Sequence, residues 1–257
     1  MAIQTEQKIF TGIGLDFETG GLDSTKNGIT QIALQSIRLD TLELIDRYVS
    51  YVVPYHRMVD EKTSKKRVLK TKFEKEKEKE PVLMDYEDEA LSYSGISFDT
   101  LLKSGADMVK VANDTLEFGK AATLSKGKQT KPMLIGQNIT FDIGFLQQLM
   151  TYAGLTKEFE KIFAGTKDFY GNFQPHYIDT IDLARLALAN DPLMPSYKLE
   201  IICSRLGIEL DDAHDADADV TATLNVARVC AARLRNMSVN ADGVIHKAEK
   251  SRKHFKI

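Results

Sequence analysis

The sequence of 257 residues contains only two cysteines, Cys203 and Cys230, and both lie in apolar patterns with helical spacing. A disulfide framework or a cysteine-ligated metal site is therefore not expected, whereas two buried free thiols are. No apolar run approaches the roughly 18 residues that a membrane span requires. The first residues also lack the basic region and the apolar core of a signal peptide. These absences predict a soluble, cytoplasmic protein with no membrane partner.

A surplus of positive charge is also absent, because the formal net charge is −3. A nucleic-acid surface would therefore have to be local. The sequence predicts one domain over residues 1–236, with a charged insertion at about 56–88 and a polar, basic tail over 237–257. Within the insertion, the basic residues between Lys65 and Lys72 allow two interpretations. The segment is either a solvated excursion or an arm that contacts phosphates.

Apolar periodicity predicts an α/β domain built on one mixed sheet. Three strands joined by short connections are typical of an antiparallel meander, and two shorter strands follow later in the chain. The expected strands cover residues 8–17, 29–39, 42–54, 132–136 and 176–179. The expected helices cover residues 97–102, 108–124, 141–153, 180–189, 197–206 and 216–234. Asn138 is the expected N-cap of the helix over 141–153, and residues 155–175 are expected to be irregular.

Two carboxylates end the first strand, Asp16 and Glu18. Residues two apart in a strand point to the same face, so these side chains would emerge side by side. Their repulsion and their loss of hydration are unfavourable in an apolar strand. A divalent cation that prefers oxygen ligands, Mg²⁺ or Mn²⁺, would compensate. In the alternative interpretation, Glu18 lies beyond the strand end and is only solvated.

Two further acidic segments have ordinary explanations when each is considered alone. Asp142 lies in the first turn of a predicted helix, where the helix macrodipole favours an acid. The segment from Asp211 to Asp219 contains five aspartates and His214 at the start of another predicted helix. Considered together with Asp16, they provide what hydrolysis of a phosphodiester by two metal ions requires. Several carboxylates hold the ions, and a histidine accepts a proton at neutral pH.

The ordered set of motifs resembles the DEDDh family of 3′→5′ exonucleases, which includes polymerase proofreading subunits, RNase T and oligoribonuclease. Residues 16–22 are similar to its D-x-E-T-x-G-L opening, and residues 138–146 to its N-x-x-F-D-x-x-F-L element. Residues 179–185 resemble D-T-x-x-L-A-R, and residues 214–219 resemble H-D-A-x-x-D. The likeness runs from about residue 9 to 230. The charged insertion departs from the family pattern, which affects the expected substrate and not the chemistry.

The resemblance implies a ribonuclease-H-like fold with a central five-stranded mixed sheet flanked by helices. It implies two divalent cations, Mg²⁺ or Mn²⁺, with Asp16 bridging both. Glu18 and Asp219 would hold the ion that carries the attacking water, and Asp142 would support the second ion. His214 would be the general base.

The resemblance also implies a site for the 3′-terminal nucleotide at the end of the first strand. Leu22 would lie against the base, and backbone N–H groups of the turn would lie near the 3′-OH. For Phe145 two interpretations stay open, contact with a base or a place in the core alone. The substrate-binding residues expected on these grounds are Phe17, Thr19, Gly20, Gly21, Leu22, Asn138 and Phe145.

The predicted function is a metal-dependent 3′→5′ exonuclease that releases nucleoside monophosphates from single-stranded DNA. An exoribonuclease like oligoribonuclease is the alternative, and DNA is favoured because the chain lacks the basic composition expected of an enzyme acting on structured RNA. A catalytically dead binding module is disfavoured, since no expected carboxylate is missing and His214 is present. A dinucleotide-binding loop is excluded, because Phe17 stands where the third glycine would follow Gly12 and Gly14. Replication or repair proteins are the expected protein partners.

Overall fold

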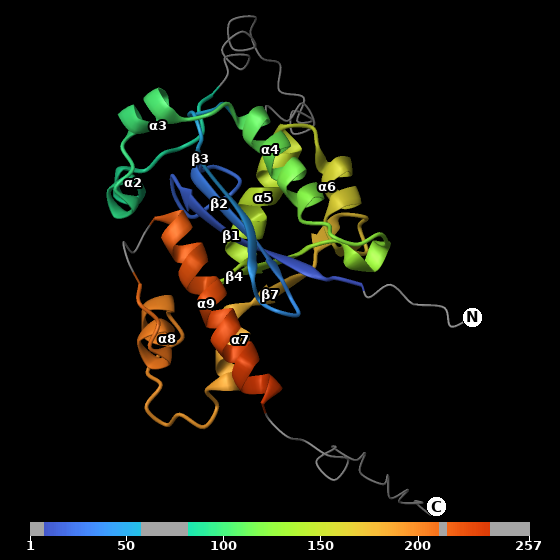
Figure 1. The fold of residues 1–257 in the computed structure, drawn as a ribbon. Coiled ribbons are helices and arrows are strands. Elements are labelled where there is room, and N and C mark those ends of the chain that lie inside the picture. The colour runs from blue at the N-terminus through green and yellow to red at the C-terminus, as the bar shows by residue number, and fades with distance from the viewer. Residues whose placement is uncertain (1–7, 58–81, 211–214, 237–257) are drawn as a thin grey trace, which may run out of the picture.

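The computed structural model describes residues 8–57, 82–210 and 215–236. Its centre is a five-stranded sheet in the order β3-β2-β1-β4-β7 (Figure 1). The first three strands form the predicted antiparallel meander, and β4 and β7 extend it with parallel pairings. The strands are β1 (Thr11–Thr19), β2 (Ile29–Arg38), β3 (Leu44–Tyr51), β4 (Met133–Gly136) and β7 (Tyr177–Asp179). The predicted α/β class and mixed sheet are confirmed.

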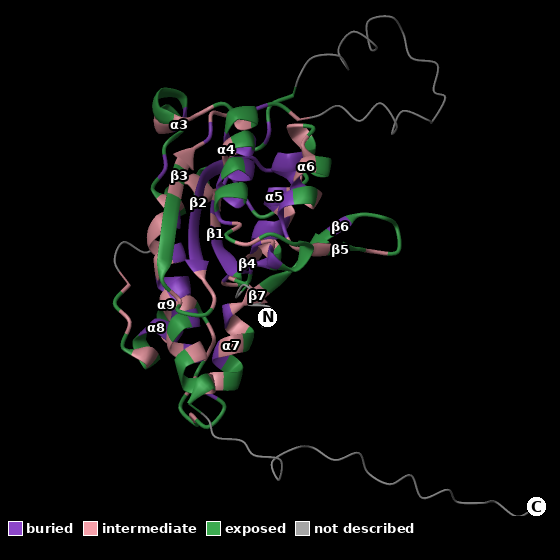
Figure 2. Ribbon diagram, turned by 45° about the vertical axis from the view of Figure 1, so that its right-hand side comes forward, coloured by how far each residue is buried: buried purple, intermediate pink, exposed green. Residues whose placement is uncertain are grey.

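Helices cover both faces of this sheet. The described helices are α2 (Asp88–Ser94), α3 (Phe98–Ser104), α4 (Met108–Ala121), α5 (Thr140–Tyr152), α6 (Thr156–Ile162), α7 (Thr180–Ala187), α8 (Leu199–Leu206) and α9 (Ala216–Arg235). Figure 1 shows α4, α5 and α6 at one side of the sheet and α9, α7 and α8 at the other. In Figure 2 the inner strands β1 and β2 are buried, whereas the edge strand β3 is largely exposed.

The residues of strand β1 lie alternately on these two sides of the sheet. Ile13, Leu15 and Phe17 belong to the larger core, which they share with α4, α5 and α6. Because alternate residues point to opposite faces, Gly14 and Asp16 lie on the side of α9. A Cβ built on Gly14 would lie only 2.8 Å from Val220 Cγ1. The glycine therefore permits the close approach of α9 to β1, and this approach places the first turns of α9 beside Asp16.

The prediction of irregular chain over residues 155–175 is wrong. This segment contains α6 and a hairpin of β5 (Gly165–Lys167) and β6 (Phe173–Pro175). The helix buries Phe159 and Ile162 and is followed by the buried Phe163. Their i, i+3, i+4 spacing is typical of a buried helical stripe, but the helix has only seven residues and is too short for a strong periodic signal.

The prediction that Asn138 caps α5 is also wrong, because the N-cap residue is Ile139. Asn138 has φ 53 and lies in the left-handed region that asparagine tolerates. Its backbone N–H donates to Asp179 Oδ1 at 3.2 Å, and the same oxygen accepts from the Ile181 N–H at 2.9 Å. Asp179 thus joins the turn after β4 to the first turn of α7.

The charged insertion was predicted at about 56–88, but its ends belong to the folded domain. Met84 is 2% exposed, and its N–H donates to Tyr55 O at 2.9 Å. Arg57 pairs with Asp85 at 2.5 Å. The central residues, 58–81, lie outside the described part of the chain, as does the predicted tail over 237–257.

Two predictions from composition bear on the described residues. Cys203 and Cys230 are both buried and free, as expected. Within residues 8–57, 82–210 and 215–236, no helix has both the length and the apolar character needed to cross a membrane.

Candidate active site

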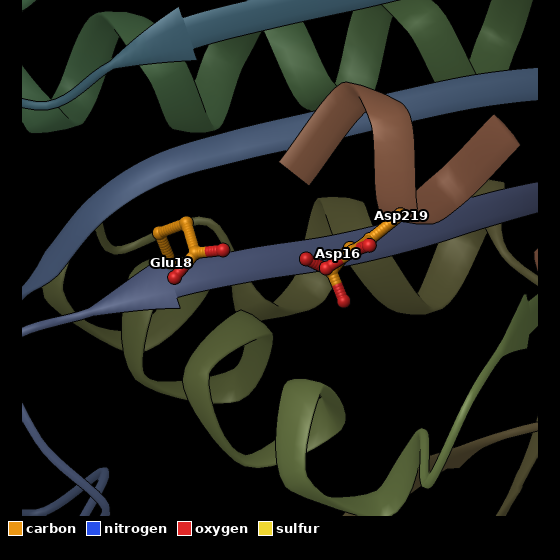
Figure 3. A group of neighbouring side chains, drawn as sticks. All are labelled: Asp16, Glu18 and Asp219. Atoms are coloured by element: carbon orange, nitrogen blue, oxygen red, sulfur yellow. The ribbon is translucent and has the colours of Figure 1, made fainter. Parts of the chain in front are cut away.

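Three carboxylates from two elements meet at the end of β1. Asp16 and Glu18 come from β1, and Asp219 comes from the first turn of α9. Each offers an oxygen atom, and these atoms all lie within 4.8 Å of one another. Figure 3 shows Asp219 reaching from the helix toward Asp16 on the strand below it. Because Glu18 is a residue of the strand itself, the interpretation that places it beyond the strand end is wrong.

Burial and mutual repulsion make the two carboxylates of β1 resist ionisation. Burial, with the added charges of Asp219 and Asp215, raises the pKa of Asp16 to about 7. Burial and then the charge of Asp16 raise the pKa of Glu18 to about 8. A bound cation would reverse both effects, because it favours the ionised forms.

Asp142 comes from the first turn of α5 and is not one of the carboxylates within 4.8 Å of one another. It is 3% exposed, and its Oδ1 accepts the Phe17 N–H at 3.0 Å. The pairing of β1 with β4 covers only Gly12–Gly14, so Asp142 satisfies a backbone donor of β1 beyond the end of that ladder. Burial and then the charge of Asp16 hold the pKa of Asp142 well above its usual range.

Two glutamines of β2 hold the start of α9 on the sheet, and reasoning from the sequence missed both. Gln31 Nε2 donates to Asp215 Oδ1 at 3.0 Å, and Gln31 Oε1 accepts the Ala216 N–H at 3.3 Å. Gln35 Nε2 donates to Asp217 Oδ1 at 2.7 Å. The two glutamines are four residues apart and hence on one face of the strand. Thr30, Ser36 and Arg38 also interrupt the apolar residues of β2, so the sequence contained no clear signal for them.

The two described aspartates before Asp219, Asp215 and Asp217, therefore have structural partners. Asp215 is the N-cap of α9, and its side chain accepts the Ala218 N–H at 3.3 Å. Asp217 also pairs with Arg47 of β3 at 3.2 Å. These contacts fix the start of the helix. Among the described acids of this segment, Asp219 is the one that joins the cluster on β1.

A cavity of about 400 Å³ opens beside Glu18, at the turn after β1. Its lining residues are Phe17, Glu18, Thr19, Gly21, Leu22, Glu87, Glu89, Ala90, Tyr93 and Phe141. Leu22 is 86% exposed at its mouth. The first motif was expected to bind a nucleotide, and its expected binding residues all line this one cavity, with the exception of Gly20.

The same turn depends on Asn27 and Gln148, which sequence reasoning also missed. Asn27 Nδ2 donates to Gly20 O at 3.1 Å and to Glu87 Oε1 at 2.9 Å. Gln148 of α5 donates to Asn27 O at 3.0 Å. A loop that carries so many polar contacts is held in one conformation, so Leu22 and the backbone beside it are placed in advance of any ligand.

Of the two interpretations of Phe145, the structure supports the one in which the side chain belongs only to the core. Phe145 is 0% exposed, and its ring lies 5.1 Å from that of Phe141. Phe141, one turn earlier in α5, lines the cavity instead. The prediction that Phe145 contacts a base is therefore wrong.

A second cavity, of about 530 Å³, lies on the side of Asp219. It is lined by Asn138 and by the basic residues Arg185 and Lys198, among others. The Arg185 guanidinium lies over the Tyr197 ring, 5.4 Å from its centroid. Glu18 thus lines one largely apolar cavity, and Asp219 lines another that contains two cations and the acid Glu200. The predicted base, His214, lies outside the described residues.

Comparison with protein families explains this arrangement. A family model described as Exonuclease, of the RNase T type, matches residues 85–227. This match covers more than half of the chain and includes Asp142 and Asp219. The chain belongs to this exonuclease family. The resemblance to the DEDDh 3′→5′ exonucleases, drawn from the motifs, is confirmed at the level of the family.

Relatives of this exonuclease domain are longer proteins. The chain is 25% identical over 213 residues to a DNA polymerase III of PolC type from Oceanobacillus iheyensis, covering 83% of this chain and 11% of that protein. Similar solved structures include exonuclease I of E. coli in complex with a dT13 oligonucleotide, with a TM-score of 0.62, 19% identity and coverage of 88% of this chain and 42% of that chain. Exonuclease I of Methylocaldum szegediense gives a TM-score of 0.61 and 22% identity, covering 88% and 41%. The likeness confirms the ribonuclease-H-like fold.

The side chains in the cluster suit hard divalent cations. All three members are carboxylates, and no thiolate or imidazole from the described part of the chain joins them. Carboxylate oxygens are the ligands that Mg²⁺ and Mn²⁺ prefer, whereas zinc sites usually include cysteine or histidine. The donor set and the raised pKa values of Asp16 and Glu18 both agree with a cation at this point of the exonuclease domain.

Proposed function

We propose that this protein is a 3′→5′ exonuclease that releases nucleoside monophosphates from the 3′ end of single-stranded DNA with the help of two Mg²⁺ or Mn²⁺ ions. One observation carries the proposal. Carboxylates from β1 and α9 meet, and one of them, Glu18, lines a cavity suited to a terminal base, while another, Asp219, lines a cavity that contains Arg185 and Lys198. The terminal nucleotide lies on one side of the scissile phosphate and the rest of the strand lies on the other, which matches this arrangement.

In the proposed mechanism the protein holds the reacting groups in place. Asp16, Glu18 and Asp219 bind the cations, and Asp142 supports them from behind Phe17. The cations supply positive charge that stabilises the charge developing on the phosphate. His214 accepts a proton from the attacking water, since its unperturbed pKa suits a base at neutral pH.

The strand would be positioned by the two cavities. Leu22 and Phe141 pack on the terminal base, and the backbone between Thr19 and Leu22 lies near the 3′-OH. Arg185 and Lys198 contact a phosphate upstream, where an arginine can donate two parallel hydrogen bonds. Asn138 lines the same cavity as Arg185 and Lys198 and would bind the strand there.

DNA is the preferred substrate in this proposal, and two likenesses support it. Exonuclease I has been solved with the single-stranded oligonucleotides dT13 and dA16. The curated relative is named a DNA polymerase III. We therefore include replication or repair proteins as partners in the proposal. A cytoplasmic location is also part of it, on the strength of the two free thiols.

A second candidate is an exoribonuclease of the oligoribonuclease kind. The observation that favours it is the pair Glu87 and Glu89 in the wall of the nucleotide cavity. A carboxylate there can accept a hydrogen bond from a 2′-OH, which RNA alone carries.

The test is digestion of 5′-labelled single-stranded DNA, duplex DNA and RNA of one sequence with Mg²⁺ or Mn²⁺. We expect a ladder that shortens from the 3′ end, fastest for single-stranded DNA, and no reaction with EDTA. The Asp16→Ala variant is the control for contaminating nucleases, and it should lose activity by several orders of magnitude. Full activity in metal-free buffer would contradict the mechanism, and faster digestion of RNA would favour the second candidate.

A further inference from the structure

The hairpin of β5 and β6 carries two aromatic side chains that contribute little to the core. Phe169 is 95% exposed and Tyr170 is 85% exposed. Their rings meet edge to face, with centroids 5.4 Å apart and planes at 86°. Figure 2 shows the hairpin projecting from the body of the domain. Two large exposed rings side by side are characteristic of binding surfaces.

The turn between the strands holds these rings in place. Asp168 Oδ1 accepts the backbone N–H groups of Tyr170 and Asn172, each at 2.9 Å. Asp168 Oδ2 accepts from the amides of Asn172 at 3.2 Å and Gln174 at 3.3 Å. Because the turn is fixed by its own hydrogen bonds, a ligand that stacks on the rings would lose little conformational entropy of the protein on binding.

The base of the same hairpin forms one wall of a cavity of about 380 Å³. It is lined by Phe10, Thr11, Leu39, Lys128, Gln129, Lys131, Met133, Ala164, Gly165 and His176. The titratable residues in this lining are two lysines and a histidine, and none is acidic. Burial and then the charge of Lys128 lower the pKa of Lys131. An anion in the cavity would favour the charged form of Lys131 and so oppose both effects on its pKa.

Two described acids beside the hairpin, Glu160 and Asp168, are already engaged. Glu160 pairs with Lys167 at 2.9 Å, and its backbone oxygen accepts from Lys131 Nζ at 2.9 Å. Asp168 is occupied by the hydrogen bonds of the turn. The cavity therefore presents positive charge, together with the apolar surface of Phe10, Leu39 and Met133.

We propose that the hairpin and the cavity at its base form a second, non-catalytic binding site for single-stranded nucleic acid. Phosphates would lie against Lys128 and Lys131, and bases would stack on Phe169 and Tyr170. A cationic groove combined with aromatic platforms is how proteins bind single strands without reading their sequence. That the ligand is a nucleic acid rests on the proposed function.

This second site is distant from the carboxylates. Thr11 and Met133, which line the cavity, are at the beginnings of β1 and β4, whereas Asp16 and Glu18 are near the end of β1. Seven residues of strand from Thr11 to Glu18 correspond to about 23 Å. At about 3.4 Å for each stacked nucleotide, a strand that reaches both sites must have several nucleotides. The second site would therefore retain long substrates and leave the shortest ones unaffected.

The experiment measures binding of a 5′-fluorescein-labelled dT20 strand by anisotropy in the Asp16→Ala background, which keeps the strand intact. We expect Phe169→Ser with Tyr170→Ser to raise the Kd at least tenfold. We expect Lys128→Ser to reduce the slope of log Kd against log salt by about 0.7. Phe169→Trp with Tyr170→Trp should retain tight binding, because tryptophan also stacks. Leu102→Ser and Lys103→Ser are matched controls, because both residues are exposed and lie on α3, more than 60 residues before the hairpin.

The two proposals fail in distinguishable ways. With Asp16 restored, the hairpin variants should cleave a dinucleotide at the parental rate while the KM for dT20 rises. A Kd for dT20 within twofold of the parent would overturn the second site and leave the exonuclease intact. Absence of cleavage by the parent protein would overturn the proposed function, whatever the hairpin variants bind.

Discussion

Gln31 Nε2 donates a 3.0 Å hydrogen bond to Asp215 Oδ1, and this contact joins the middle strand of the meander to the cap of α9. Gln31 and Asp215 are 184 residues apart in the sequence. Asp219 lies one turn further along α9, so its distance from Asp16 depends on where the cap sits. Gln31 therefore positions a carboxylate that it does not itself contact.

The Gln31→Leu substitution should lower catalysis without weakening substrate binding. The variant loses both hydrogen bonds to the start of α9, so Asp219 is held less firmly. We expect kcat to fall by about 10–100-fold, together with the affinity for Mn²⁺, as is typical when a group that orients metal ligands is removed. The KM for a single strand should stay within twofold of the parent.

Thr30→Val is the matched control for this variant. Thr30 neighbours Gln31 on β2, is 0% exposed, and has an Oγ1 atom with no hydrogen-bond partner among the described residues. Valine has the same shape and no buried hydroxyl, so stability should stay the same or rise. Equal losses of kcat in both variants would show that any change in β2 disturbs the site and that Gln31 has no special role.

Stability in metal-free buffer should fall as the pH rises from about 4 to about 8. In the folded protein the pKa of Asp16 is raised from its ordinary 3.8 to about 7, and that of Glu18 from 4.5 to about 8. Between these pKa values the folded state keeps protons that the unfolded chain releases. The contribution of both groups to stability is therefore complete below the ordinary pKa values and is lost as the pH rises through the raised pKa values. Thermal unfolding in EDTA at several pH values measures this, and Mg²⁺ should restore the loss at pH 8. A melting temperature that rises over this range in EDTA would contradict it.

Asp142 can be tested with two substitutions that separate its charge from its hydrogen bond. In Asp142→Asn the amide oxygen can still accept the Phe17 N–H, so the melting temperature should stay within about 4 °C of the parent. Activity should nevertheless fall by about 100-fold, because the negative charge beside the cations is lost. Asp142→Leu removes both features and leaves a buried N–H unpaired, which costs about 1–3 kcal/mol of stability. An asparagine variant with parental activity would show that Asp142 serves only the backbone of β1.

The motifs in the sequence predicted the carboxylates better than their surroundings. Asp16, Glu18 and Asp219 are short acidic side chains at the ends of strongly patterned elements, so alternation and helix starts located them. Their positioning residues could not be found in this way. Gln31, Asn27 and Gln148 act through contacts that join distant segments, and no local pattern distinguishes such a glutamine from a solvated one.

The remaining errors in the predicted fold arose where the apolar pattern of the sequence is weak or ambiguous. Helix α6 and strands β5 and β6 have only three to seven residues each, and their positions are decided by packing against α4 and by pairing with each other. Phe145 and Phe141 share one apolar stripe, and only the three-dimensional position of α5 shows which ring reaches the cavity. Asn138 looked like a cap because it precedes a helix, but the chain uses its tolerance of positive φ to turn after β4.

His214 should act as the general base, a prediction that rests on the family motif. His214→Ala should lower the rate by about 10²–10⁴ and leave the Kd for single-stranded DNA unchanged. The parental rate should rise with pH through the imidazole pKa, and the variant should lose this rise. Single-turnover rates between pH 5 and 9 measure both effects, and an identical pH profile in the variant would assign the proton to another group.

The close contact between β1 and α9 at Gly14 provides the sharpest test of how the site is assembled. In Gly14→Ala the new methyl group would lie 2.8 Å from Val220 Cγ1 and 3.0 Å from two atoms of Leu224. Real Cβ atoms essentially never approach another atom as closely as 2.8 Å, so Val220 must shift. Its branched side chain has little rotamer freedom in a helix, so we expect α9 to move away from β1 and to carry Asp219 away from Asp16. We expect a loss of activity and of Mn²⁺ affinity that exceeds the loss of stability, because the strain is relieved by moving the helix that carries one ligand.

The Gly14→Ala, Val220→Ala double variant tests this explanation directly. Removing the two methyl groups of Val220 makes room for the new one, so activity and Mn²⁺ affinity should recover toward those of Val220→Ala alone. The interaction energy of the double-mutant cycle then reports the steric contact. If the two losses simply add, α9 does not move in response to residue 14, and Gly14 must be required for another reason.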